Sequence, residues 1–180
     1  RPLRVTDKGV AGMYFFSELT THLKDEKIDC VLFDQTLPNP ADTQVHEGAA
    51  IYKSQRCDCL IAVGGGSPID CAKAIGVIVS NGGKIHDYAK DFNTVPKPIP
   101  YLAAIPTTAG SGSECTAASI VTNTEGRHYK MTIMDAHLLP SLAVVDPMIM
   151  VNLPPHLTSA TGLDALTHSV EAYVALGAND

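Results

Sequence analysis

The chain has 180 residues, of which 45% are apolar, 6% aromatic and 18% charged, and its formal net charge is −6. This proportion of apolar side chains supports a packed core and excludes a disordered chain. The acidic balance includes no long basic run, which argues against a nucleic-acid partner. No apolar stretch approaches the roughly 18 residues that span a bilayer, and no signal peptide opens the sequence. We therefore expect a soluble, cytoplasmic protein with no membrane partner.

The cysteines give the same indication about compartment. They form neither a repeated CxxC pattern nor an even set, and the pair around Asp58 is poorly spaced for a zinc ribbon. We expect all five to be free, reduced thiols, as is usual in the cytosol. They are Cys30, Cys57, Cys59, Cys71 and Cys115.

In the first 80 residues, short apolar runs alternate with apolar residues at helical spacing. Strands are predicted over residues 3–6, 28–33 and 59–63, and helices over residues 13–23, 42–52 and 68–80. We expect Asp42 to cap the second helix and Ser67 to cap the third, with Pro68 at its first position. Three strand–helix repeats favour an α/β fold with a parallel, doubly wound sheet.

The pattern loosens after Gly83. A stiff proline connector leads into a strand, a hairpin and a last strand, predicted over residues 101–105, 119–134 and 142–145. From residue 154 the apolar spacing is helical only. We therefore divide the chain into an α/β domain, 1–153, and the start of a helical domain, 154–180. The second part is too short for a core of its own, so the sequence looks truncated.

Three glycines, Gly64, Gly65 and Gly66, and then Ser67 separate the clearest strand from a helix. Glycines let backbone N–H groups approach a bulky anion, and the helix start would direct its partial positive charge at a pyrophosphate. The segment is not the GxGxxG fingerprint, so a standard Rossmann assignment is not supported. The alternative is a tight turn that binds nothing.

Two further segments follow strands of the same predicted sheet. Asp7 ends the first strand, where a carboxylate could accept hydrogen bonds from a ribose, but taken alone this position favours a helix cap. Residues 106–114 are rich in hydroxyls, including those of Thr107 and Thr108, and would suit phosphate or ribose contacts. The alternative for this segment is a surface loop. Because ligands of such sheets bind beyond the carboxyl ends of the strands, we expect residues 106–114 and the glycine turn to face one crevice.

A third group lies on the predicted C-terminal helix. Asp164 and His168 are four residues apart, so one face of the helix presents both, and they could hold a metal ion together. Such a pair can also simply support a helix, and two ligands do not complete a four-coordinate site. We expect the remaining histidines to be surface or capping residues: His22, His46, His86, His128, His137 and His156.

Taken together, these segments resemble the iron-dependent (group III) alcohol dehydrogenases. The resemblance covers nearly the whole chain, in the family's order, and rests on five stretches: Val5–Gly9, Pro38–Pro40, Gly64–Asp70, Ile105–Gly110 and Ala160–His168. It implies a nucleotide-binding α/β domain followed by a helical domain, with the active site between them. It also implies that this chain lacks a first N-terminal segment and the downstream helices that would supply two further metal ligands.

The resemblance also implies roles for individual residues. Asp7 would hold the adenosine ribose and favour NAD over NADP, and Asp164 and His168 would be the first two ligands of a divalent metal, usually Fe²⁺. The other residues that would line the cofactor are Asn39, Gly65, Gly66, Ser67, Asp70, Thr107, Thr108 and Lys130. The reaction would be hydride transfer between NAD and a primary alcohol or aldehyde, with the metal as Lewis acid.

Alternatives from the residues and the resemblance stay open. One is a Zn²⁺-dependent polyol dehydrogenase or a dehydroquinate synthase-like enzyme of the same fold. Another is a non-catalytic nucleotide-binding module, which would gain support if the natural gene also ended near Asp180. We also expect that an open strand edge could pair with a second copy, giving a homo-oligomer.

Overall fold

A computed structural model describes residues 1–89 and 95–178 of the chain. Its centre is a five-stranded sheet in the order β2-β1-β3-β4-β7, and every neighbouring pair is parallel. The strands are β1 (Pro2–Val5), β2 (Val31–Phe33), β3 (Cys59–Gly64), β4 (Leu102–Pro106) and β7 (Leu142–Ala143). This arrangement confirms the α/β fold with a parallel sheet.

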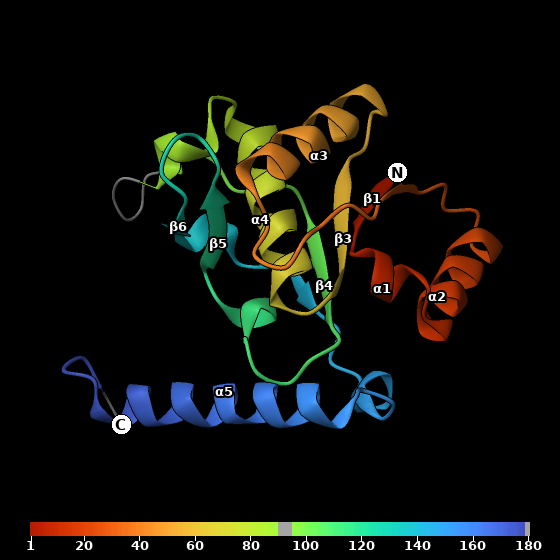
Figure 1. Cartoon of the computed structure of the whole chain (residues 1–180). Coiled ribbons are helices and arrows are strands. Elements are labelled where there is room, and N and C mark those ends of the chain that lie inside the picture. The colour runs from red at the N-terminus through yellow and green to blue at the C-terminus, as the bar shows by residue number, and fades with distance from the viewer. Residues whose placement is uncertain (90–94, 179–180) are drawn as a thin grey trace.

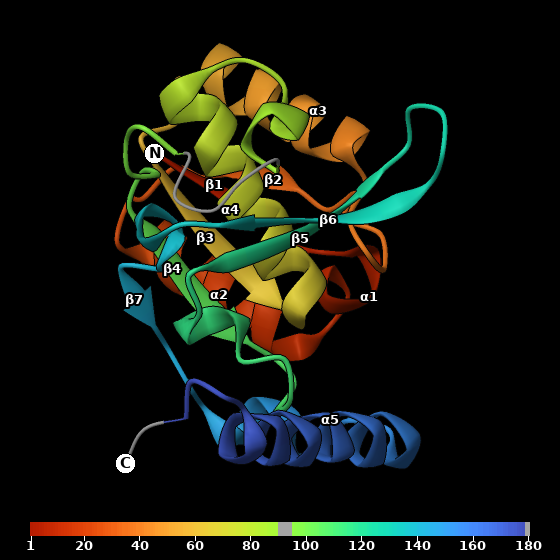
Figure 2. The same cartoon turned by 90° about the vertical axis from the view of Figure 1, so that its left-hand side faces the viewer.

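Helices cover both faces of the sheet, as a doubly wound fold requires (Figures 1 and 2). One face carries α1 (Lys8–Ala11) and α2 (Tyr14–Asp25), and the other carries α4 (Gly66–Asn81), against which α3 (Asp42–Ser54) packs. Four short 3₁₀ turns complete the connections: η1 (Ile85–Tyr88), η2 (Ser113–Cys115), η3 (Ala136–Leu138) and η4 (Pro147–Met150).

The predicted hairpin forms a second, two-stranded antiparallel sheet from β5 (Ala118–Asn123) and β6 (Tyr129–Met134). It packs on the outer side of α4, so that this helix lies between the hairpin and the main sheet (Figure 2). Burial on two sides explains why α4 is apolar around most of its circumference. Ten of its residues are buried, including Ile69 and Ile75, which are both fully inaccessible to solvent.

The C-terminal segment is a single long helix, α5 (Pro155–Val174), which lies across the end of the sheet near the loop that follows β4 (Figure 1). None of its residues is buried. One close approach joins it to the α/β part: a Cβ at Gly110 would lie 2.6 Å from the carbonyl oxygen of Thr161. Among the described residues, no helix combines the length and the apolar character needed to cross a membrane.

Two local expectations about helix starts were wrong. The N-cap of α3 is Ala41, and Asp42 is the first helical residue, whose carboxylate instead binds Thr124 of the hairpin loop. The N-cap of α4 is Gly65, because the chain is already helical at Gly66, so Ser67 does not cap it. In both cases tertiary contacts set the first helical residue, which propensity alone cannot locate within a residue or two. β2 is also shorter than expected, while the five cysteines are free, as expected.

Candidate functional site

A cleft of about 840 Å³ lies at the carboxyl end of the main sheet. Its walls come from the segments that follow four different strands, and α5 with the residues before it forms another side. This is the crevice in which the parallel-sheet rule places a ligand. The lining residues are Asp7–Val10, Met13, Asp34–Pro38, Gly65–Pro68, Thr107, Thr108, Ser111, Leu153, Pro154, Leu157, Thr161 and Asp164.

The strand order explains why the cleft opens here. The chain passes from β1 to β2 on one side and then returns to place β3 on the other side of β1. Connections therefore leave β1 and β3 in opposite directions, and a crevice remains at this switch point. Asp7 follows β1 and Gly65 follows β3, so both lie at the switch. The hydroxyl of Thr6, which is buried, donates to the carbonyl of Val63 at 2.7 Å and ties the two strand ends together.

The glycine turn has no room for side chains. Gly64 has a φ of +151°, and a Cβ there would lie 2.5 Å from Cγ of Pro68. A Cβ at Gly66 would meet the side chain of Ser111 at 3.0 Å, and no side chain caps the start of α4. The first N–H groups of a helix have no intrahelical acceptor. The turn is thus a close-approach surface with unused donors at a helix start, which suits a pyrophosphate.

Asp7 can both cap a helix and contact a ligand in the cleft. Its Oδ1 accepts a hydrogen bond from the N–H of Val10 at 2.9 Å, so it does cap α1. It also lines the cleft and is partly exposed. A carboxylate has two oxygens and about four acceptor positions, so the cap leaves acceptor capacity that faces the cleft.

The hydroxyl-rich loop after β4 forms the part of the wall next to the glycine turn, because β4 pairs with β3. The N–H of Thr107 continues the sheet ladder by donating to the carbonyl of Gly64 at 2.9 Å. Thr108 then lies beside the turn, since a Cβ at Gly65 would be 3.3 Å from its Oγ1. The two loops were expected to face one crevice, and Thr107, Thr108 and Ser111 all line it.

Three of the residues implied by the resemblance do not line the cleft. Asn39 lies at its edge, in a left-handed conformation with a φ of 55°, and its N–H donates to Ser67 Oγ at 3.2 Å. Lys130 is an exposed residue of β6, opposite Thr122 in the hairpin. Asp70 points from α4 toward the hairpin.

Asp70 and Lys73 join α4 to the hairpin. The carboxylate of Asp70 accepts from the hydroxyl of Ser113 and from the N–H of Ile120, and burial raises its pKa above the ordinary value. Lys73 is fully buried and donates to the carbonyls of Thr116 at 2.7 Å and Ala118 at 2.8 Å. Burial lowers the pKa of Lys73 to about 8, against the opposing effect of Asp70. These contacts hold the hairpin against α4, so both residues have a structural role here.

Asp164 and His168 meet on one face of α5, as their spacing predicted. His168 Nε2 lies 3.6 Å from Asp164 Oδ1, both side chains are about half exposed, and Asp164 lines the cleft. An imidazole nitrogen and a carboxylate oxygen suit Fe²⁺ and Zn²⁺ alike. Within residues 1–89 and 95–178, however, no group of three or more His, Cys, Asp or Glu side chains could hold a metal ion. The pair could therefore supply two of the four ligands of a four-coordinate metal site.

The expectation that His86 is a surface residue was wrong. Its Nε2 lies 2.5 Å from Asn123 Oδ1 and 3.2 Å from Asp42 Oδ2, and its side chain is only 22% exposed. The carboxylate of Asp42 also accepts from the N–H and the hydroxyl of Thr124. Although burial opposes it, these hydrogen bonds lower the pKa of Asp42. No sequence pattern indicates this cluster, because its members are up to 82 residues apart.

Sequence reasoning also missed the cleft residues that carry no chemical motif. Gln35 and Leu37 follow β2, while Leu157 and Thr161 come from α5. The one available signal was position: any residue just after a strand of a parallel sheet is a candidate for the ligand crevice. The contribution of α5 could not be found this way, since it depends on where that helix packs.

The fold and the cleft together define a nucleotide-binding type of α/β domain. The model of the family "Iron-containing alcohol dehydrogenase" matches residues 1–147. The chain belongs to this family, and the resemblance stated from the sequence is confirmed.

Individual relatives agree with this assignment. The chain is 45% identical over 178 residues to the NAD-dependent methanol dehydrogenase of Bacillus methanolicus, a match that spans 99% of this chain and 46% of that protein. The 1,3-propanediol dehydrogenase of Citrobacter freundii is 42% identical, with the same coverage. A crystal structure of 1,3-propanediol oxidoreductase superposes with a TM-score of 0.95, covering 99% of this chain and 46% of that one. The chain thus spans about half the length of these relatives.

Proposed function

We propose that this chain is the cofactor-binding part of an NAD-dependent alcohol dehydrogenase that transfers a hydride between NAD and a primary alcohol or aldehyde. The observation that carries the proposal is the cleft at the β1/β3 switch point, where a glycine turn with an uncapped helix start lies beside a partly exposed carboxylate. The names of the relatives, an NAD-dependent methanol dehydrogenase among them, support the same activity.

The chain's own residues would divide the work of cofactor binding. Gly65, Gly66 and Ser67 would present backbone N–H groups to the pyrophosphate, at a place where a Cβ would already crowd Thr108 or Ser111. The free acceptor positions of Asp7 would take the hydroxyls of the adenosine ribose. Thr107 and Thr108 would contact the cofactor from the adjoining part of the wall. Asn39 would act from the cleft edge, through its neighbour Ser67.

Two further residues assigned by the resemblance have weaker structural support. Asp70 already accepts hydrogen bonds from Ser113 and Ile120, so it would act on the cofactor by fixing the wall of the cleft. Lys130 would reach a cofactor only from the hairpin, outside the cleft lining. We therefore place the cofactor contacts first on the residues that do line the cleft.

A divalent metal, Fe²⁺ or alternatively Zn²⁺, would be held in part by Asp164 and His168. When bound, such a cation supplies Lewis-acid polarisation of the alcohol oxygen. Because Asp164 lines the same cleft as the glycine turn, α5 would bring the metal side of the reaction toward the nicotinamide side. In this proposal residues 1–153 form the cofactor domain and residues 154–180 begin the helical metal-binding domain. A cytoplasmic, homo-oligomeric enzyme acting on small alcohols is part of the same proposal.

Asp7 provides the sharpest test of cofactor binding. A carboxylate at the ribose repels the 2′-phosphate of NADP, so we expect the chain to bind NADH at least about tenfold more tightly than NADPH. Asp7→Asn should reduce this preference by about tenfold, because it removes the charge but keeps the shape. Fluorescence titration of the two reduced cofactors measures both affinities. The matched control is Asp25→Asn, the same change on an exposed residue at the end of α2.

Two results would contradict the proposal. If neither reduced cofactor bound, the cleft would not be a dinucleotide site. If Asp25→Asn altered the preference as much as Asp7→Asn, the effect would be one of net charge and not of ribose recognition.

Metal binding has a separate expectation. With only two ligands among the described residues, the 180-residue chain should bind Fe²⁺ or Zn²⁺ weakly. Tight one-to-one binding in calorimetry, lost in His168→Ala, would show that the chain completes a site by itself.

A further inference from the structure

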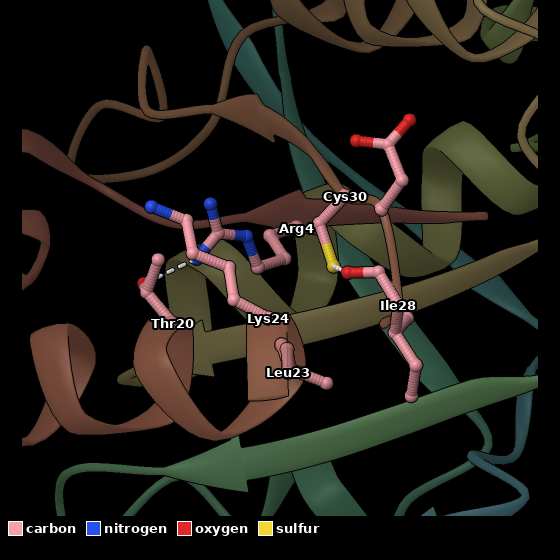
Figure 3. Close-up of a pocket in the computed structure, with 7 residues that line it drawn as sticks. Arg4, Thr20, Leu23, Lys24, Ile28 and Cys30 are labelled. Atoms are coloured by element: carbon pink, nitrogen blue, oxygen red, sulfur yellow. Dashed lines mark hydrogen bonds between the residues drawn. The ribbon is translucent and has the colours of Figure 1, made fainter. Parts of the chain in front are cut away.

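A second, smaller pocket lies away from the cleft, between β1 and the end of α2 (Figure 3). Its volume is about 90 Å³, several times the roughly 10–15 Å³ that a single water needs. It has none of the cleft residues in its wall and nothing in the proposed function uses it. Its lining residues are Arg4, Thr20, Leu23, Lys24, Ile28, Asp29 and Cys30.

The pocket is built around a buried cation. Arg4 is only 8% exposed, and its guanidinium carbon lies 5.1 Å from the ring centroid of Phe16. Its Nη1 donates to Thr20 Oγ1 at 2.5 Å, a bond drawn in Figure 3. Its Nε is buried and meets no acceptor among the described residues. A guanidinium has five N–H donors, so most of its hydrogen-bonding capacity is left over at this position.

No carboxylate neutralises Arg4 within the part of the chain that the structure describes. The one acid in the pocket wall is Asp29, and its carboxylate pairs with Arg1 Nε at 2.9 Å. Lys24 adds a second positive charge at the rim; Figure 3 shows its side chain on the same side of the pocket as Arg4. A buried, unpaired charge is expensive. The pocket wall thus carries two cationic side chains, and its one carboxylate already pairs with Arg1.

We propose that this pocket is a binding site for a small oxyanion of the phosphate or sulfate type. Apart from the N–H that Nη1 donates to Thr20, the guanidinium of Arg4 has N–H groups without an acceptor among the described residues, and two of these would bind two oxygens of the anion, the paired geometry for which arginine is suited. Lys24 would add charge from the rim. Thr20 is a positioning residue, since its own proton goes to the carbonyl of Phe16 at 2.7 Å and its oxygen accepts from Arg4. Leu23 and Ile28 supply the apolar part of the pocket wall.

The experiment is a titration of the 180-residue chain with inorganic phosphate, with sulfate, and with chloride at matched ionic strength. Calorimetry gives the affinity, and the ¹H–¹⁵N resonance of the Arg4 Nε–H reports the site directly. We expect saturable shifts of this resonance with phosphate and sulfate and none with chloride. Loss of one charge-assisted pair costs about tenfold in affinity, so Arg4→Leu should weaken phosphate binding at least that much. Lys24→Gln should weaken it by a few-fold.

The control variant is Arg127→Leu, which makes the same change of charge at an exposed position in the hairpin loop. Both variants keep the glycine turn, so phosphate bound there would contribute equally to their titrations, and failure of the proposed cofactor function would not alter the comparison. Arg4→Leu should fold, because it replaces an unpaired buried charge in a strand by an apolar side chain, which is often neutral or stabilising. Its melting temperature in phosphate-free buffer provides that check.

Several outcomes would overturn the proposal. An Arg4 Nε–H resonance that phosphate leaves unmoved would show an empty pocket. Equal phosphate affinity in Arg4→Leu and Arg127→Leu would place the anion elsewhere. An effect reproduced by chloride would be simple screening.

Discussion

The helices α4 and α5 have similar apolar character, but α4 is buried and α5 is exposed. α4 has 16 residues, of which ten are buried between the main sheet and the hairpin, whereas none of the 20 residues of α5 is buried. Leucines of α5 such as Leu163 and Leu166 are 64% and 58% exposed. An apolar stripe therefore stabilises a helix only where neighbouring elements supply a surface to cover it, because most helical stability in proteins comes from such packing.

The same contrast holds for the charged groups. On α4, Asp70 and Lys73 are held by hydrogen bonds from and to the hairpin, and burial changes both of their pKa values. On α5, Asp164 and His168 face one another at 3.6 Å but remain about half exposed. A pair in contact with water contributes little to stability, whereas buried groups make stability depend on their partners and on pH.

The largest expected difference between the two helices comes from deleting core methyl groups. Ile75 is fully buried in α4, so Ile75→Ala should lower the free energy of unfolding by about 2–5 kcal/mol. The matched change in α5, Leu166→Ala, should alter it by less than about 0.5 kcal/mol. Urea unfolding of the 180-residue chain followed by circular dichroism measures both. Similar losses in the two variants would show that α5 is packed in solution.

The buried Lys73 should make stability depend on pH. Its folded pKa of about 8 lies below the ordinary 10.5, so between these values the unfolded chain binds more protons and stability from this residue rises with pH. Over the full range between these two pKa values, the contribution of Lys73 to the free energy of unfolding changes by about 3 kcal/mol.

Lys73→Met removes this dependence, so the difference in unfolding free energy between the wild type and the variant should be constant below about pH 8. Between about pH 8 and pH 10.5 the wild type should become progressively more stable relative to the variant. Urea unfolding at a series of pH values checks it, and His168→Ala on α5 is the control, expected to change stability by less than about 0.5 kcal/mol. A flat difference across the whole range would mean that Lys73 is not buried as a neutral or poorly solvated amine.

Two glycine-to-alanine changes give the smallest effects, and they should have opposite signs. In α4, a Cβ at Gly76 would lie 2.8 Å from Cβ of Ile99, so Gly76→Ala should destabilise by about 1–3 kcal/mol. In α5, a Cβ at Gly162 meets nothing within 4 Å, so Gly162→Ala should favour the helix by about 0.5–1 kcal/mol. Unfolding free energies and helical content distinguish the two, and equal signs would contradict the packing difference.

Much of the fold could be predicted from local patterns. The strand at residues 59–63, the hairpin at 119–134 and the helix after Pro154 all appear where periodicity placed them. The first helical residues of α3 and α4 could not be predicted in this way, since the caps are Ala41 and Gly65 and not Asp42 and Ser67. A helix start depends on which nearby acceptors satisfy the free N–H groups, and Asp42 had a distant partner, Thr124, that no local pattern reveals.

The candidate cleft divides in the same way. Its glycine turn, Asp7 and the hydroxyl loop were visible because each follows a strand and carries residue types suited to phosphate or ribose. The placement of Lys130 and Asp70 outside the lining, and of Leu157 and Thr161 within it, depended on how the hairpin and α5 pack. The burial of the Arg4 guanidinium could not be predicted for the same reason, since the pattern of a strand does not show which groups will face each side chain.

The sequence by itself determined the parallel α/β class and the glycine turn, because these depend on backbone freedom and on the period of apolar residues, which are local properties. Only the tertiary structure decided that α4 is buried while α5 is exposed, that His86 contacts Asp42, and that Arg4 is buried with no carboxylate partner among the described residues. These are properties of contacts between residues distant in the chain, and burial and charge pairing are defined by those contacts alone.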